Sequence, residues 1–137
     1  MGVKVIALDI YGTVLASEDA ENILPARKGL EELFDRCESK GIKVVTASDA
    51  SLINLKIDLK ESGVNISKLD NFYELKQFPK DFSGIIEDYG IESGELLVIG
   101  DSDKDINGAV NCKAKYFRVP EYVGIGDDFD LNSISFS

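Results

Sequence analysis

Residues 3–9 read Val3-Lys4-Val5-Ile6-Ala7-Leu8-Asp9, a short and mostly apolar run that ends directly in a carboxylate. The run contains β-branched residues and is too short for a typical helix, so it predicts a strand that is buried on both faces. Strands of this kind occur in parallel sheets that are covered by helices. Asp9 would then stand at the carboxyl end of the strand, where ligands bind in open α/β sheets.

The rest of the chain alternates between helical and extended patterns. Apolar residues recur at helical spacing in four segments, and further short apolar runs predict strands near residues 42–46, 72–75, 95–99 and 115–119. Repeated strand-then-helix units are typical of a parallel sheet with helices on both faces. We therefore expect an α/β fold with a three-layer α/β/α, Rossmann-like core and a five-stranded, mainly parallel sheet.

The composition excludes several kinds of chemistry and of partner. The chain has no His, which rules out Ser-His-Asp catalysis and imidazole metal sites. Its formal net charge of -10 repels phosphate backbones, so a nucleic-acid partner is not expected.

No apolar run approaches the roughly 20 residues of a membrane helix. The two cysteines, Cys37 and Cys112, favour a reducing, cytoplasmic location. The length of 137 residues predicts one domain over 1–137, with the less regular residues 121–137 packed back on it.

Polar side chains follow four of the predicted strands. They are Asp9, Thr46, Lys76 and the loop Gly100-Asp101-Ser102-Asp103-Lys104-Asp105. Because the carboxyl ends of parallel strands meet at one edge of the sheet, we expect these groups to share one crevice. Carboxylates suit Mg²⁺, a carboxylate can act as a nucleophile, and Mg²⁺ with Lys76 would offset its repulsion of a phosphate. The set predicts a phosphoryl-transfer site.

The same segments resemble the motifs of the haloacid dehalogenase-like (HAD) superfamily. Asp9-Ile10-Tyr11-Gly12-Thr13-Val14-Leu15 resembles the first motif, Thr46 after Lys43-Val44-Val45 the second, and the loop from Gly100 to Asp105 the acidic fourth. The third-motif Lys has two candidates, Lys76 and Lys80. Lys76 is preferred, since the family places this Lys one helix before a Gly, here Gly90. The resemblance covers about Val3 to Val119.

The resemblance implies a role for each matched residue. Asp9 would be the catalytic nucleophile and a Mg²⁺ ligand, with the Tyr11 backbone carbonyl as a second ligand and Asp101 as a third. Asp105 would support the metal site through water or Lys76. Thr46 and Lys76 would bind the phosphoryl group. The implied activity is that of a Mg²⁺-dependent phosphatase or phosphotransferase that forms an aspartyl-phosphate on Asp9.

Tyr11 departs from the pattern of the family's phosphatases. Most of them carry a second Asp two residues after the nucleophile, which protonates the leaving group and then activates water. A phenol with a pKa of about 10 is a poor base at neutral pH, so we expect slow hydrolysis. Two alternatives stay open: a catalytically impaired HAD-fold binding or regulatory module, and a haloacid dehalogenase-like enzyme. Dehalogenases resemble the chain at Tyr11, but they need no metal and have a less acidic fourth motif.

The spacing of the motifs leaves no room for a cap domain. Asp9 and Pro25 are 16 positions apart, and Thr46 and Lys76 are 30 apart, an interval already filled by a predicted helix and strand. The resemblance therefore implies a capless member. Such a member would act on a phosphorylated substrate that covers the site itself, or would form a homo-oligomer in which a neighbouring subunit supplies the lid.

Overall fold

A five-stranded parallel sheet forms the centre of the computed structural model, which describes residues 2–17 and 25–136. Its strands are β1 (Val5–Leu8), β2 (Lys43–Ser48), β3 (Asn71–Glu74), β4 (Leu96–Gly100) and β5 (Lys115–Arg118). They are ordered β3-β2-β1-β4-β5, and each neighbouring pair is parallel. The predicted α/β class and parallel sheet are confirmed.

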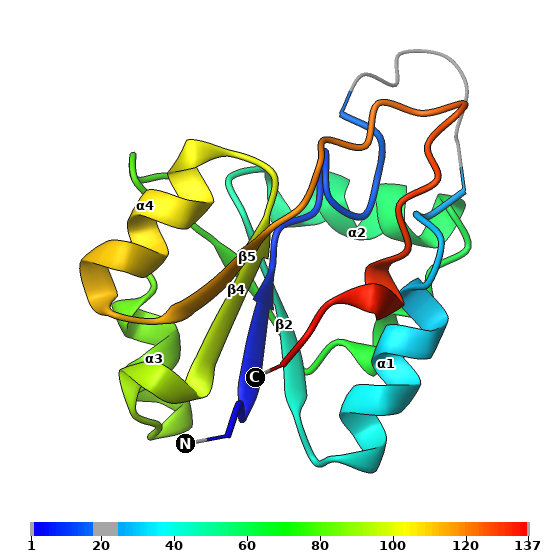
Figure 1. The fold of residues 1–137 in the computed structure, drawn as a ribbon. Coiled ribbons are helices and arrows are strands. Elements are labelled where there is room, and N and C mark those ends of the chain that lie inside the picture. Colours follow the sequence, from blue (N-terminus) through cyan, green and yellow to red (C-terminus); the bar gives the residue numbers. More distant parts are fainter. Residues whose placement is uncertain (1, 18–24, 137) are drawn as a thin grey trace.

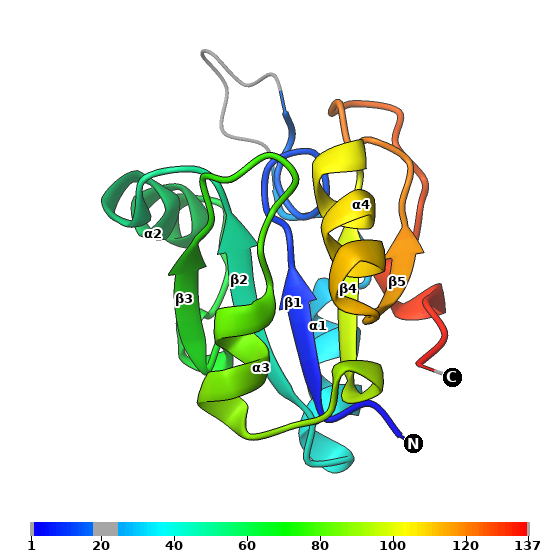
Figure 2. The ribbon, with the colours of Figure 1, turned by 90° about the vertical axis from the view of Figure 1, so that its left-hand side faces the viewer.

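Helices cover both faces of the sheet. They are α1 (Leu30–Ser39), α2 (Leu52–Glu61), α3 (Ser83–Tyr89) and α4 (Asp103–Cys112), with short 3₁₀ turns at Ile66–Lys68, Ser93–Glu95 and Leu131–Ser133. Figures 1 and 2 show α1 and α2 on one face and α3 and α4 on the other, which is the predicted three-layer arrangement. No described residue belongs to a separate cap layer, and the interval between β2 and β3 is filled by α2 and one 3₁₀ turn.

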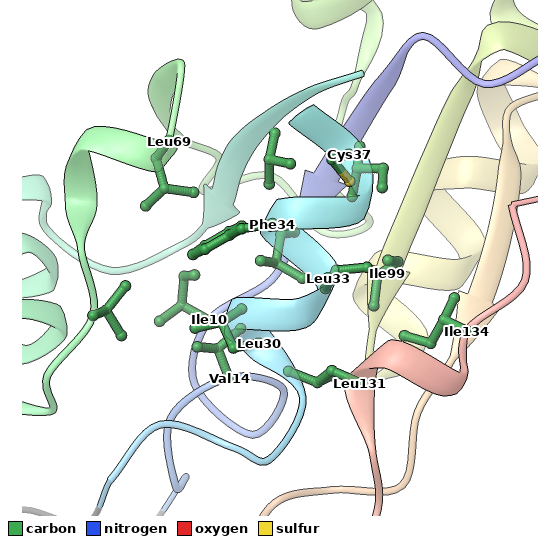
Figure 3. Packing of buried hydrophobic residues seen from close by; sticks show 14 of the residues in the cluster. Ile10, Val14, Leu30, Leu33, Phe34, Cys37, Leu69, Ile99, Leu131 and Ile134 are labelled. Carbon is green, nitrogen blue, oxygen red and sulfur yellow. The ribbon is translucent and has the colours of Figure 1, made fainter. Parts of the chain in front are cut away.

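The core divides into two clusters because successive strand side chains point to opposite faces. In β1, Ile6 and Leu8 pack on the α1 and α2 side, whereas Val5 and Ala7 pack on the α3 and α4 side. The buried residues of α1 recur at helical spacing and form one stripe, whose members are Leu30, Leu33, Phe34 and Cys37. Figure 3 shows this stripe against residues from the sheet and from the chain's last turn.

The C-terminal segment, residues 121–136, lies against α1 and the turn that follows β1. Leu131 and Ile134 are fully buried in the α1 cluster, as Figure 3 shows. Arg36 of α1 donates hydrogen bonds to the carbonyls of Asn132 and Ile134, at 3.0 and 2.6 Å. The remaining residue of the segment, Ser137, lies outside the described residues.

The strand order fixes where a ligand can bind. From β1 the chain builds outward through β2 to β3, and it then returns to the other side of β1 to form β4 and β5. Leu8 of β1 is therefore in register with Ile99 of β4, although the two are far apart in sequence. Side chains that follow these two strands meet at the switch point of the sheet, which is the usual ligand-binding position.

No helix among the described residues is long and apolar enough to cross a membrane.

Candidate active site

Three carboxylates meet at this switch point. Asp9 follows β1, Asp101 follows β4, and Asp105 belongs to the first turn of α4. Each offers one carboxylate oxygen, and these three oxygens lie within 4.8 Å of one another. Asp9 and Asp105 are buried and Asp101 is half-buried. Clustered carboxylate oxygens are the donor set of a hard divalent cation, so these residues fit a Mg²⁺ site.

Two glycines allow the carboxylates to approach so closely. Gly12 has φ +86°, and a Cβ at this position would overlap the carboxylate of Asp101. A Cβ at Gly100 would overlap the side chain of Asp105. Any larger residue at either position would therefore push an acidic group out of the cluster.

Lys80 is the cation that binds this cluster. Its side chain is 1% exposed, and its Nζ donates to Asp9 Oδ1 at 2.9 Å, Asp105 Oδ1 at 2.5 Å and the Ala47 carbonyl at 2.7 Å. These three bonds use all three protons of the ammonium group. Its backbone is also fixed, because its N–H donates to the Lys104 carbonyl at 3.1 Å.

Lys76, the preferred third-motif candidate, lies elsewhere. Its side chain is 67% exposed and its Nζ is 3.4 Å from Glu74 Oε2. The physical reason is that β3 is the edge strand, two strands away from β1, so a residue directly after β3 lies far from Asp9. The chain crosses back over the sheet before α3 begins (Figure 2), and this crossing delivers Lys80 to β1.

Thr13 is a site residue to which the sequence analysis gave no role. Its fully buried Oγ1 is 3.1 Å from Asp9 Oδ2 and 3.2 Å from Asp101 Oδ1. A hydroxyl has one proton, so it can donate to only one of these carboxylates at a time. The sequence feature that could have indicated this role is the position of Thr13 directly after Gly12 in the first motif.

Thr46 lies in β2, in register with Leu8, and is fully buried. The next residue, Ala47, supplies the carbonyl that Lys80 binds. Thr46 Oγ1 has no hydrogen-bond partner among the described residues. A buried hydroxyl is normally paired, so an unpaired one beside the cluster is suited to a ligand.

The Tyr11 side chain is engaged away from the cluster. Its hydroxyl donates a hydrogen bond to Asp58 of α2. Burial, and then the bond to the Asp58 carboxylate, raise the pKa of the Tyr11 phenol. The side chain at the usual acid/base position is thus a weaker proton source than a free phenol.

Negative charge exceeds positive charge in the cluster. Burial raises the pKa of Asp9, and Asp105 and the hydrogen bond with Asp101 raise it further, although Lys80 acts in the opposite direction. Burial lowers the pKa of Lys80, but Asp9 and Asp105 outweigh it, so the pKa is raised and the ammonium stays charged. A divalent cation would supply the positive charge that the cluster lacks.

The raised pKa of Asp9 predicts that the metal-free protein loses stability as the pH rises above the ordinary carboxyl range. In that range the folded state holds a proton that the unfolded chain has released, so the free energy of unfolding falls with pH until Asp9 ionises in the folded state. Denaturant unfolding in EDTA at about pH 5 and about pH 8 measures this slope. Asp9→Asn should reduce the dependence of the free energy of unfolding on pH. Mg²⁺ should stabilise the wild type most at the higher pH, because carboxylate ligands must be deprotonated to bind a metal. Equal slopes in the wild type and Asp9→Asn would contradict the prediction.

The chain is similar to proteins of one family. Residues 3–113 match a family model described as haloacid dehalogenase-like hydrolase. The curated protein SUPPRESSOR OF QUENCHING 1, chloroplastic, from Arabidopsis thaliana is 31% identical over 87 residues, which cover 59% of this chain and 8% of that protein. The chain thus spans only a small part of that relative's length.

Two solved structures show the same fold. A HAD-superfamily hydrolase of subfamily IA from Geobacter sulfurreducens PCA superposes with a TM-score of 0.68 at 13% identity, covering 88% of this chain and 96% of that one. CbbY from Rhodobacter sphaeroides, in complex with phosphate, superposes with a TM-score of 0.69 at 11% identity, covering 93% and 90%.

Proposed function

Since the chain belongs to the haloacid dehalogenase-like hydrolase family, we propose that it is a Mg²⁺-dependent phosphatase or phosphotransferase acting through an aspartyl-phosphate on Asp9. The observation that carries this proposal is the cluster of Asp9, Asp101 and Asp105, in which the buried Lys80 ammonium binds Asp9 and Asp105. Such a cluster requires a cation and leaves a carboxylate beside it that can attack an electrophile. The similar fold of CbbY, solved with phosphate, adds support.

The residues would divide the chemistry as follows. The Asp9 carboxylate attacks phosphorus as the bond to the leaving oxygen breaks, and Lys80 offsets the negative charge that gathers there. Asp9, Asp101 and the Tyr11 carbonyl would hold Mg²⁺, with Asp105 in support. When bound, Mg²⁺ neutralises the phosphoryl oxygens and orients them for attack.

We assign hydrogen bonding of the phosphoryl group to Thr46 and neutralisation of its charge to Lys80, whose three protons are already donated. Support comes from the unpaired, buried hydroxyl of Thr46, which a phosphoryl oxygen would satisfy. Lys80 replaces Lys76 in this proposal because its Nζ is 2.9 Å from Asp9 Oδ1, whereas Lys76 faces solvent.

Hydrolysis of the aspartyl-phosphate is expected to be the slow step. The Tyr11 hydroxyl donates to Asp58 and its pKa is raised, so it can neither deprotonate water nor readily donate a proton at neutral pH. The same observation favours one second candidate, a module that binds phosphate and Mg²⁺ with little turnover. The haloacid dehalogenase alternative is less well supported, since three clustered carboxylates would be unfavourable in a site that uses no metal.

Pre-steady-state kinetics test the proposal. A chromogenic phosphoester with Mg²⁺ should release about one equivalent of alcohol per protein in a burst, followed by a slower steady rate. Tyr11→Asp should raise the steady rate by up to about 10²–10⁴-fold, the range of general acid–base catalysis. Tyr11→Phe is the matched control and should leave the rate unchanged. If no phosphoester released its alcohol in a Mg²⁺-dependent way, while phosphate or beryllofluoride bound tightly, the enzyme proposal would be rejected in favour of the binding module.

The remaining expectations extend this proposal. The substrate would be a phosphorylated molecule that covers the site itself, or a second subunit of a homo-oligomer would provide the lid. The free cysteines Cys37 and Cys112 support a reducing, cytoplasmic location. Nucleic acid is not a proposed partner, because of the net charge of -10.

A further inference from the structure

A buried guanidinium joins the C-terminal segment to the chain just before α1. The Arg27 side chain is 0% exposed and forms a two-pronged ion pair with Asp127, with Nε to Oδ2 at 3.0 Å and a terminal nitrogen to Oδ1 at 2.7 Å. Its guanidinium carbon also lies 5.4 and 4.9 Å from the ring centroids of Tyr122 and Phe129. Burying such a charge is costly, and an apolar residue would often serve stability equally well, so the group calls for a further role.

The rest of Arg27 is directed at the turn that follows β1. Its second terminal nitrogen donates to the Thr13 carbonyl at 3.3 Å, and its backbone N–H donates to the Val14 carbonyl at 2.8 Å. From the C-terminal segment, the Tyr122 N–H donates to the Gly12 carbonyl at 2.7 Å. Three successive carbonyls of the turn are therefore held from outside it, and Figure 1 shows the orange segment running beside the blue turn.

The held turn carries the hydroxyl that contacts both site carboxylates. Thr13 Oγ1 lies 3.1 Å from Asp9 and 3.2 Å from Asp101. A small displacement of the turn would break one or both contacts, because hydrogen bonds weaken steeply beyond these distances. The Thr13 carbonyl, held by Arg27, therefore sets the place of the Thr13 side chain.

We propose that Arg27, fixed by Asp127, is a positioning residue that holds Thr13 between Asp9 and Asp101. The expected effect of Arg27 on turnover rests on the proposed function. The effect of Arg27 on the position of Thr13 between the two carboxylates does not depend on turnover. The C-terminal segment thus contributes to the geometry of the site through its bonds to the turn that follows β1.

Arg27→Lys and Asp127→Asn test this role, with Arg36→Lys as the matched control. Arg36 also anchors the C-terminal segment, but its hydrogen bonds go to the Asn132 and Ile134 carbonyls and its ring contact, at 3.9 Å, to Phe136, and not to the turn. The first readout is amide hydrogen exchange in the turn, where the N–H groups of Thr13, Val14 and Leu15 bond to the Ile10 carbonyl. The second is Mg²⁺ affinity by calorimetry, and the third is the split between kcat and KM.

Both test variants should speed exchange in the turn and weaken Mg²⁺ binding by about 10–100-fold, the range for residues that orient metal ligands. They should lower kcat more than they raise KM. Arg36→Lys should keep wild-type exchange in the turn, Mg²⁺ affinity, kcat and KM. Equal effects in Arg27→Lys and Arg36→Lys, or unchanged exchange in both test variants, would overturn the proposal. An inactive wild type would remove the proposed function alone, because exchange and Mg²⁺ affinity still decide the role of Arg27.

Discussion

Asp9→Asn is expected to lower Mg²⁺-dependent phosphatase turnover by on the order of 10⁴-fold or more, as loss of a covalent nucleophile does. The amide has nearly the shape of the carboxylate but cannot attack phosphorus to form the acyl phosphate. It also removes one of the three carboxylates that could hold the metal, so it should weaken Mg²⁺ binding. Steady-state rates with saturating Mg²⁺ measure the loss.

The Asp9→Asn variant should stay folded, which separates lost chemistry from lost structure. Asp9 is buried and its pKa is raised, so the metal-free folded state already favours the neutral form of this group, which the amide of Asn resembles in shape and charge. Its thermal unfolding in EDTA should occur at or above the wild-type temperature. Turnover within a few-fold of the wild type would show that Asp9 is not the nucleophile, and the aspartyl-phosphate mechanism would then be abandoned.

Lys80→Met should produce the second large effect. Removing the ammonium takes away a preorganised charge beside the reacting phosphoryl group, which costs about 10²–10³-fold in kcat. It also leaves Asp9 and Asp105 buried without their cation, a loss of about 3–5 kcal/mol in the free energy of unfolding for the metal-free protein. Denaturant titration in EDTA and kinetics with Mg²⁺ measure the two effects separately.

Lys76→Met is the matched control for this experiment. Lys76 pairs with Glu74 at the surface, and an exposed pair contributes about 0–1 kcal/mol. We expect near wild-type stability and turnover from this variant. If Lys76→Met instead lost the greater part of the activity, Lys76 would have to reach the phosphoryl group in the bound state, contrary to the assignment of Lys80.

Residues placed by regular strands were the most predictable part of the site. Asp9 and Asp101 follow apolar strands directly, and parallel strands end at one edge of the sheet, so their convergence follows from the alternating pattern. Asp105 was predictable for a similar reason, because it lies one helical turn beyond Asp101. The five-stranded parallel sheet and its two helical layers follow from the same alternation.

Residues placed by loops were less predictable. The choice between Lys76 and Lys80 depended on how far the chain travels back from the edge strand before α3, and periodicity does not encode that path. The role of Thr13 depends on the left-handed backbone of Gly12, which turns the chain beneath Asp101. Arg27 and Asp127 pair across 100 positions of sequence, a distance over which no local pattern carries information.

The pairing of β1 with β4 also sets the order in which the site can form during synthesis. Asp9 is synthesised well before the strand that completes its surroundings, β4, which begins only at Leu96. Until then one edge of β1 stays open, and closing it requires a long-range contact of the kind that slows folding. A nascent chain released before residue 100 would expose an apolar strand edge and carry the proposed nucleophile, Asp9, without a partner carboxylate. Phosphatase activity would therefore report that β4 has paired with β1.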